Sequence, residues 1–466
     1  MKVIMYGLSA NPPGIHHRLL VQEMAKYADL VIVVPCGLRP DKLTTNDIPP
    51  LYRAAMTDMT FQDIPNVCVD LSDLERSVFT RSWELLQRYE REYPGAELCL
   101  AVGGDLIANG RYGESAIHRK WEQGKTLWEN ANFIVCNRLH TPFDPVDLPP
   151  HCQFVHVDLV GSSTDIRDRV FGHKPITGLV MPSVETYIHR YNLYRGMMAA
   201  TTAKHASLDN PRLLILADAE TPRAMAIASQ FARFEDAENP NGILVCGGDG
   251  MMLQAIRQEW RRRLPFIGMN AGHWGFLMNS FEEITAMDHA FDDLSFVQSP
   301  MLYVESVRPD GTTANALAFN DCWTHSQNNG QAAKSEVRVN GRVCLKSVVS
   351  DGMLVSTAAG STSYARAMGA MPLPVGSSQL ILVGSNVFSP FGWRPAYLPI
   401  TDRICIRTLE PEKRPVDAFV DGISFGQTMQ LDARTSNIAS VEIGFFGAHD
   451  LQEKIRAIQF VEQYLQ

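Results

Sequence analysis

The sequence of 466 residues has few of the features that mark secreted, membrane or zinc-bound proteins. Its nine cysteines are scattered, and no two have the spacing of a zinc-ligand pair. No apolar run reaches membrane-spanning length, and residues 1–7 enter a strand-like run without the pattern of a cleaved signal. We therefore expect free, buried thiols and a cytoplasmic protein that has no membrane contact.

The chain also has no excess of positive charge. It carries 42 Lys and Arg against 51 Asp and Glu, a formal net charge of -9. Its longest basic cluster, residues 257–263, is typical of the solvated face of a helix. Nucleic acid is therefore not an expected partner. With 45% hydrophobic and 20% charged residues, the composition is that of an ordinary globular protein with large cores.

The length predicts two domains. Short β-branched runs alternate with amphipathic stretches over residues 1–196, which predicts a doubly wound parallel sheet. A polar stretch, 197–211, is expected to be a linker. A second α/β lobe should follow at 212–295, and then a mostly β, sandwich-like lobe at 296–466. The expected strands lie at residues 3–5, 30–34, 67–69, 98–102, 133–135, 213–216, 242–246, 265–269, 316–319, 335–339, 353–356, 379–383 and 441–445.

A glycine turn, Gly247-Gly248-Asp249-Gly250, follows an apolar strand in the second half and precedes a helical stretch. Glycines let backbone N–H groups approach a phosphate, and the helix N-terminus adds a favourable dipole. A carboxylate beside phosphates is repulsive unless it binds the metal or takes a proton from the attacking hydroxyl. Alone, the turn is equally typical of a tight turn whose aspartate caps the helix.

Three later clusters accompany this turn. Residues 268–277 contain three glycines and Asn270, Asn320-Asp321 follows an apolar run, and residues 351–364 end in Gly-Ser-Thr-Ser-Tyr. Together with the glycine turn, these clusters resemble the NAD kinase family over residues 212 to about 450. The pattern departs from the family at Met251, Trp274 and Asp321, where threonine, leucine and glutamate are usual.

This resemblance implies a chemical role for each cluster. Asp249 would be the base on the adenosine 2′-hydroxyl of NAD, and Gly247, Gly248 and Gly250 would hold the phosphates of ATP, with Mg²⁺ or Mn²⁺. Asn320 and Asp321 would hydrogen-bond the ribose and nucleotide of NAD. The other residues that the resemblance places in the nucleotide-binding site are Asn270, Ser361, Thr362, Tyr364 and Asp421.

The first strand leads into residues 7–18, a glycine turn with a proline pair and two histidines at the start of an amphipathic helix. Such a loop can present donors to a triphosphate, although alone it is more typical of a surface loop. Residues 161–167, Gly-Ser-Ser-Thr-Asp-Ile-Arg, combine a helix cap with hydroxyls and an arginine fork. With residues 33–42, 102–105 and 179–188, these motifs resemble nicotinamide and nicotinate mononucleotide adenylyltransferases, over residues 1 to about 194.

In that family the nucleotide is bound by a His-x-x-His motif, whose positions correspond to Gly14 and His17 here. The resemblance implies that His17 is catalytic and that His16 is a candidate substitute for the missing histidine. The other residues that it assigns to the nucleotides are Gly7, Lys42, Gly103, Asp105, Ser163, Thr164 and Arg167. The reaction would be in-line attack of the mononucleotide phosphate on the α-phosphorus of ATP, with Mg²⁺ and no covalent enzyme intermediate.

Together the two resemblances imply a bifunctional enzyme that makes NAD and then phosphorylates it to NADP. Nicotinamide mononucleotide is favoured over the nicotinate form, since the product of the acid would need amidation before phosphorylation. Two alternatives stay open: an N-terminal domain that only senses nucleotide, and a dinucleotide-binding protein with no catalysis. Asp249 argues against the second alternative, since a pure binder has little use for a carboxylate beside phosphates. Self-association as a homo-oligomer is also implied.

Overall fold

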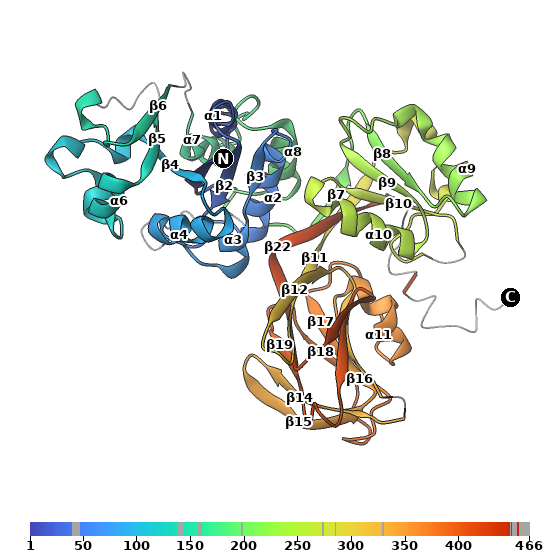
Figure 1. Cartoon of the computed structure of the whole chain (residues 1–466). Helices are drawn as coiled ribbons and strands as arrows, with labels where there is room; N and C mark the ends of the chain where they lie inside the picture. Colours follow the sequence, from blue (N-terminus) through green and yellow to red (C-terminus); the bar gives the residue numbers. More distant parts are fainter. Residues whose placement is uncertain are drawn as a thin grey trace. The chain divides into compact units, whose positions relative to one another are not determined.

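The computed structural model describes residues 1–39, 47–137, 144–156, 161–196, 199–272, 275–284, 286–328, 330–447, 449 and 454–455. The chain divides into two compact units, Met1–Ala200 and Thr201–Gln466 (Figure 1). Among the described residues, no helix is both long and apolar enough to cross a membrane. All nine cysteines are free, but Cys68 and Cys344 are exposed, so the expectation of uniformly buried thiols is wrong.

The first unit contains a six-stranded sheet in the order β3-β2-β1-β4-β5-β6, and all its neighbouring strands are parallel. The strands are β1 (Lys2–Leu8), β2 (Leu30–Pro35), β3 (Val67–Val69), β4 (Glu97–Gly103), β5 (Asn132–Asn137) and β6 (Cys152–His156). The strand order reverses between β1 and β4. In open α/β sheets, the carboxyl ends of the strands at such a reversal are where ligands bind.

Both faces of this sheet are buried, as a parallel sheet requires. Val3 and Met5 of β1 pack in a core with Leu85 of α4 and Leu127 of α6, while Ile4, on the opposite face, has no exposed surface. The helices of the unit are α1 (Ile15–Ala25), α2 (Pro50–Phe61), α3 (Ser72–Arg76), α4 (Ser82–Glu92), α5 (Ala116–Lys120), α6 (Gly124–Asn130), α7 (Ser163–Phe171) and α8 (Pro182–Arg190).

The second unit begins with an α/β part. Its parallel strands are β8 (Leu213–Ala217), β9 (Gly242–Gly247) and β10 (Phe266–Asn270), with helices α9 (Pro222–Gln230) and α10 (Asp249–Glu259). Residues 202–206, expected within a linker, instead form strand β7, which pairs antiparallel with β11 (Leu294–Val307). The polar sequence of β7 hid this pairing, because backbone hydrogen bonds define the strand and only its residue Ala203 is buried.

Two long strands connect this part to the β lobe. β11 has 14 residues and β22 (Gln430–Phe446) has 17, and they pair antiparallel along most of their length. Figure 1 shows both strands running from the α/β part into the β lobe. The far end of β22 pairs in parallel with β10, so residues 441–445, expected in the β lobe, lie in the α/β sheet. The sequence has no turn to mark where a continuous strand passes from one part to the other.

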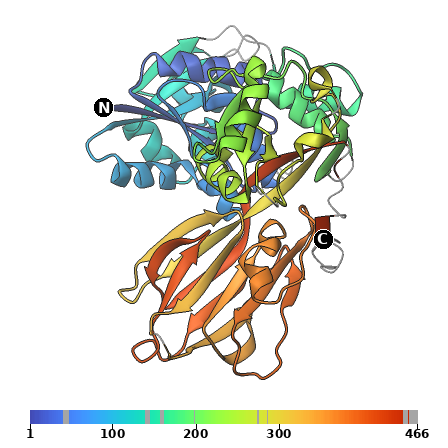
Figure 2. The ribbon, with the colours of Figure 1, turned by 90° about the vertical axis from the view of Figure 1, so that its right-hand side faces the viewer.

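The β lobe is a sandwich of two sheets (Figure 2). Val304 and Leu431 from one sheet and Met353 and Leu382 from the other share one buried core. The remaining strands are β12 (Thr313–Ala318), β13 (Asp321–Ser326), β14 (Ala333–Val339), β15 (Arg342–Ser350), β16 (Gly352–Ser356), β17 (Gln379–Ser385), β18 (Ala396–Pro399), β19 (Ile404–Thr408), β20 (Val416–Val420) and β21 (Ile423–Gln427), and the helix is α11 (Tyr364–Ala367).

A buried asparagine joins β10 to β22. The side chain of Asn279 has no exposed surface, and its amide nitrogen donates to the carbonyl oxygens of Gly268 (2.9 Å) and Gly444 (3.1 Å). Its amide oxygen accepts from the backbone N–H of Phe446 at 3.0 Å. One side chain therefore satisfies three buried backbone groups of two strands, which makes it costly to replace.

We expect Asn279→Leu to lower the free energy of unfolding by about 2 kcal/mol or more, because the Gly444 carbonyl and the Phe446 N–H lose this partner. The Gly268 carbonyl keeps its bond from the backbone N–H of residue 279 (2.8 Å). Urea denaturation followed by fluorescence measures the change. Asn328→Ala, at an exposed position, should change stability by less than about 0.5 kcal/mol. A loss under about 1 kcal/mol for Asn279→Leu would contradict this account of the sheet.

Candidate functional site

The glycine turn lies between buried strand β9 and helix α10. A Cβ at Gly247 would lie 2.8 Å from that of Met251, so this position is packed within the protein. At Gly248 and Gly250, no protein atom lies within 4 Å of the position that a Cβ would take. These two glycines therefore leave open space at the start of the helix, where backbone N–H groups can bind an anion.

Asp249 is held by a second loop and does not cap its own helix. Its Oδ2 accepts from the N–H of Phe276 (2.9 Å) and its Oδ1 from that of Leu277 (3.0 Å), while Gly248 is the N-cap residue of α10. Burial raises the pKa of Asp249, against the two amides and the charge of Lys454, which lower it. The interpretation of the turn as a simple aspartate cap is therefore wrong.

The loop after β10 lies beside the glycine turn. The N–H of Ala271 donates to the carbonyl of Gly247 at 2.8 Å. Asn270 turns back on its own loop, since its side-chain oxygen accepts from the N–H of Gly272 at 3.1 Å. Trp274, named above as a departure from the NAD kinase pattern, lies outside the described residues.

Two buried carboxyl groups meet where β13 begins. The Asp421 carboxylate accepts from the N–H groups of Phe319 (2.8 Å), Asn320 (2.8 Å) and Asp321 (3.1 Å). Burial and the charge of Asp421 raise the pKa of Asp321 to about 7. Burial also raises the pKa of Asp421, but its three amide donors oppose the rise, so Asp321 is the member of the pair that takes a proton.

The basic stretch 257–263 is not a simple solvated face, as the sequence had suggested. Arg257 on α10 donates to the backbone carbonyl of Asp421. Arg263 is only 7% exposed, and its guanidinium lies 4.8 Å from the ring centre of Trp260. Part of this charge therefore holds α10 against the turn that contains Asp421.

The cluster at 351–364 packs against Asn320. The N–H of Thr357 donates to the carbonyl of Asn320 (2.9 Å), and the Thr357 hydroxyl donates to that of Phe319 (2.7 Å). A Cβ at Gly360 would lie 2.3 Å from the Asn320 carbonyl oxygen, so only glycine fits there. The buried Ser361 hydroxyl donates to the Ala358 carbonyl (2.6 Å) and accepts from the N–H of Leu373 (2.8 Å), so it is used within its own loop.

The end of this cluster reaches an aromatic stack that no motif indicated. The ring of Tyr364, which is 53% exposed, stacks on Trp323 with 5.2 Å between centres, and Trp323 stacks on Phe419 at 4.7 Å. Thr362, just before Tyr364, donates its hydroxyl to the carbonyl of Ala359 at 3.4 Å. Trp323 and Phe419 come from neighbouring strands, so only the strand pairing brings them together.

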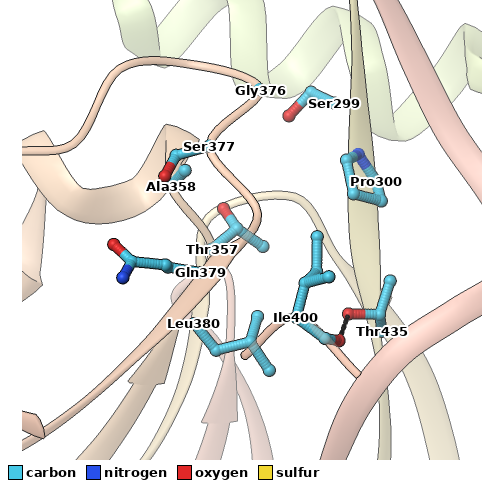
Figure 3. Close-up of a pocket in the computed structure, with 10 residues that line it drawn as sticks. All are labelled: Ser299, Pro300, Thr357, Ala358, Gly376, Ser377, Gln379, Leu380, Ile400 and Thr435. Carbon is cyan, nitrogen blue, oxygen red and sulfur yellow. Dashed lines mark hydrogen bonds between the residues drawn. The ribbon is translucent and has the colours of Figure 1, made fainter. Parts of the chain in front are cut away.

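A small pocket lies behind the same loop (Figure 3). Ser299 and Pro300 of β11, Thr357, Ser377 and Thr435 are among its lining residues, and the Thr435 hydroxyl donates to the Ile400 carbonyl at 2.6 Å. Its cavity leaves about 10 Å³ for the centre of a water molecule, which is far below the usual range for a bound small molecule. It is therefore too small for a dinucleotide.

In the first unit, the predicted residues gather at the carboxyl ends of β1 and β4. Gly7 is near the end of β1, Gly103 is the last residue of β4, and the exposed Asp105 follows it directly. These ends lie at the reversal of strand order described above. Lys42 lies outside the described part of the chain.

The motif at 161–167 packs against the loop after β1. The hydroxyl of Ser163 donates to the carbonyl of Pro12 (2.8 Å), and the guanidinium of Arg167 donates to that of Asn11 (2.7 Å) and to the hydroxyl of Thr164 (3.3 Å). The fold therefore joins two motifs that are about 150 residues apart in sequence.

Two histidines stand at the start of α1. Nδ1 of His17 accepts a hydrogen bond from the N–H of Gly14 at 3.1 Å. When the imidazole is neutral, its proton is therefore on Nε2. The rings of His16 and His17 are 3.9 Å apart. Ring atoms of His16 lie 2.6 Å from where a Cβ at Gly14 would be and 2.7 Å from one at Gly161. His16 therefore occupies the space that both glycines leave.

Comparison with known proteins gives related sequences for the C-terminal region. No protein-family model matches the chain. The NAD kinase of Rickettsia bellii is 33% identical over 225 residues, 48% of this chain and 88% of that protein. Those of Xanthomonas oryzae pv. oryzae (31% over 255 residues, 54% and 98%) and Hyphomonas neptunium (33% over 229 residues, 48% and 87%) are similar. The chain belongs to the NAD kinase family.

Solved structures of an NADH kinase and an NAD kinase also match. Yeast NADH kinase complexed with NADH has a TM-score of 0.46 and 16% identity, over 55% of this chain and 90% of the other. An NAD kinase from Archaeoglobus fulgidus in complex with ATP has a TM-score of 0.41 and 21% identity, over 53% and 99%.

The departures from the NAD kinase pattern have structural counterparts here. Met251, where the pattern has threonine, packs against the core that contains Val245 and Ile256. Asp321, where the pattern has glutamate, is 5% exposed and lies beside Asp421. The first position therefore contributes packing, and the second contributes a carboxyl group whose pKa is raised by burial and by the neighbouring Asp421.

The groups that hold Asp249 leave no sign in the sequence. Two of them are backbone amides, which no residue type reveals, and Lys454 lies far along the chain from the loop it contacts. Within the described residues, no three His, Cys, Asp or Glu side chains are placed to bind a metal. Mg²⁺ usually enters nucleotide sites with substrate phosphates and only one or two carboxylates from the protein.

The raised pKa of Asp321 makes stability depend on pH. An aspartate titrates near pH 3.9 in an unfolded chain, so the folded protein binds more protons between about pH 4 and 7, and stability falls as pH rises through this window. Asp321→Asn cannot titrate, so the variant does not undergo this loss of stability as pH rises. We expect its stability relative to the parent to rise by about 2.7 kcal/mol from pH 5 to pH 8, because the two pH units below the pKa of about 7 each count about 1.36 kcal/mol.

Thermal or urea unfolding at both pH values measures this difference. Asp310→Asn is the matched control, since Asp310 is exposed and Thr312 lowers its pKa, so the variant should show no such rise. Equal stability differences at pH 5 and pH 8 for Asp321→Asn would contradict the account of the pair.

Proposed function

We propose that the second unit transfers the γ-phosphoryl group of ATP to the adenosine 2′-hydroxyl of NAD, which gives NADP and ADP. The observation that carries this proposal is the placement of Asp249, fixed by two amides of a second loop beside open space at a helix N-terminus. The relatives' names supply the substrate, and the geometry supplies the base.

Each group has a definite part in this reaction. The 2′-oxygen attacks the γ-phosphorus, the bond from that phosphorus to the β–γ bridging oxygen breaks, and the hydroxyl proton passes to Asp249. The N–H groups of the glycine turn face the phosphates. Burial raises the pKa of Asp249, which makes the carboxylate a stronger base, while its amide donors keep its two oxygens oriented.

Asp249→Asn should separate catalysis from binding. The amide keeps the shape of the carboxylate but accepts no proton, so we expect the kcat of NADP formation to fall about 100-fold or more. The affinity for NAD, measured by calorimetry, should change little. Asp310→Asn, in an exposed turn, is the control and should keep full activity. An Asp249→Asn variant with the parent rate would overturn the assignment of the base.

For the first unit, we propose adenylyl transfer from ATP to nicotinamide mononucleotide, which gives NAD and pyrophosphate. The mononucleotide phosphate oxygen attacks the α-phosphorus, and the bond to the α–β bridging oxygen breaks. Support comes from the meeting of His17, Ser163 and Arg167 around one loop at the strand-order reversal. These groups would neutralise charge and orient the phosphates.

The His16 side chain lies close to Gly14, the residue that stands where the His-x-x-His motif has its first histidine. A side chain at Gly14 and the present His16 ring could not coexist, because the two would be 2.6 Å apart at the Cβ alone. The imidazole of His16 thus lies next to the place that the family motif gives to its first histidine. This favours an active site over a domain that only senses nucleotide.

His17→Ala should abolish NAD formation from nicotinamide mononucleotide and ATP but leave the phosphorylation of supplied NAD unchanged. His16→Ala should lower NAD formation by about 100-fold, the smaller end of the contribution of one such group. Chromatography of the products measures both. His151→Ala is the control, since His151 is exposed elsewhere in the same unit. Loss of both activities in His17→Ala would contradict separate sites.

A further inference from the structure

The C-terminal segment contacts the turn that holds Asp249. The ammonium group of Lys454 donates to the carbonyl oxygen of Gly275 at 2.8 Å and also to that of Met278. Between these two carbonyls lie Phe276 and Leu277, whose N–H groups bind the Asp249 carboxylate. Lys454 therefore joins the two ends of the four-residue turn that presents both donors.

A second contact attaches the same segment to the same loop. Nδ1 of His449 lies 2.9 Å from Oε1 of Glu283, and the His449 side chain is 1% exposed. The ring of His449 also stacks on Phe445, at the end of β22, with 4.9 Å between centres. The loop 275–283 is thus held from the C-terminal side at two points, and only the Lys454 contact includes the donors to Asp249.

We propose that Lys454 is a positioning residue for Asp249: it fixes the 275–278 turn so that both N–H groups point at the carboxylate, and it supplies a positive charge near the base. The inference rests on the proposed kinase function, because it assigns Lys454 a part in that reaction. In this proposal, Lys454 acts through the turn and contacts neither the phosphates of ATP nor the 2′-hydroxyl of NAD.

The charged groups that act on Lys454 and Asp249 include these two side chains themselves and the carboxylate of Glu283. Lys454 acts on Asp249, and both Asp249 and Glu283 act on Lys454. Burial lowers the pKa of Lys454, and the two carboxylates oppose that change. The charge of Lys454 lowers the pKa of Asp249. Removal of this charge should therefore raise the pKa of Asp249 and leave more of the base protonated at a given pH.

Lys454→Met tests the proposal by its pH profile. We expect kcat for NADP formation at pH 7 to fall about 10-fold, with a smaller change in KM for NAD, because the base is displaced and partly protonated. The acidic limb of the profile should move to higher pH, so the deficit shrinks as pH rises. Lys454→Arg should keep the position of the limb. Lys413→Met is the control: it removes the same charge from an exposed lysine, and its kcat and pH profile should match those of the parent.

A readout without turnover separates this proposal from the kinase function. The pKa of Asp249 can be followed by carboxyl carbon NMR of the full chain, with Asp249→Asn to identify its resonance. We expect a higher pKa in Lys454→Met than in the parent, and a parent-like value in Lys454→Arg and Lys413→Met. An unchanged pKa in Lys454→Met would overturn the proposal. If the parent itself made no NADP, the kinase function would fail, and the titration would still decide whether Lys454 acts on Asp249.

Discussion

The site in the second unit depends on two hydrogen bonds, from the N–H groups of Phe276 and Leu277 to Asp249. They form only if β9 and β10 are neighbours and the loop after β10 returns to the glycine turn. Asn279 holds the end of that loop between β10 and β22, and Lys454 joins the carbonyls on either side of the donors. A buried polar network of this kind is stable because its hydrogen-bonding groups are matched.

Helix α10 links the Asp249 site to the β lobe. α10 begins at Asp249, and its Arg257 donates to the carbonyl of Asp421. The Asp421 carboxylate in turn accepts hydrogen bonds from the N–H groups of Phe319, Asn320 and Asp321. The proposed base and the expected NAD-binding residues are therefore linked through protein contacts, and the long strands β11 and β22 run through both parts.

Local sequence patterns predicted most strands and the places where polar residues gather, since alternation and glycine turns are local properties. They did not predict that residues 202–206 pair with β11, because that strand is made by backbone bonds to a distant partner. Nor could they show that β22 pairs both with β19 of the β lobe and with β10 of the α/β part, or that Arg263 is buried over Trp260. In the site, the motif residues were visible, whereas amide donors and Lys454 were not, because their roles exist only in three dimensions.

We propose that one chain both makes and phosphorylates NAD. The most direct test is a time course of the unmodified protein with Mg-ATP and nicotinamide mononucleotide, with all dinucleotides resolved by chromatography. The account predicts that NAD appears first and NADP follows, and that supplied NAD is converted to NADP. Absence of NADP when NAD is supplied would contradict the kinase, and absence of any dinucleotide from either mononucleotide would contradict the adenylyltransferase.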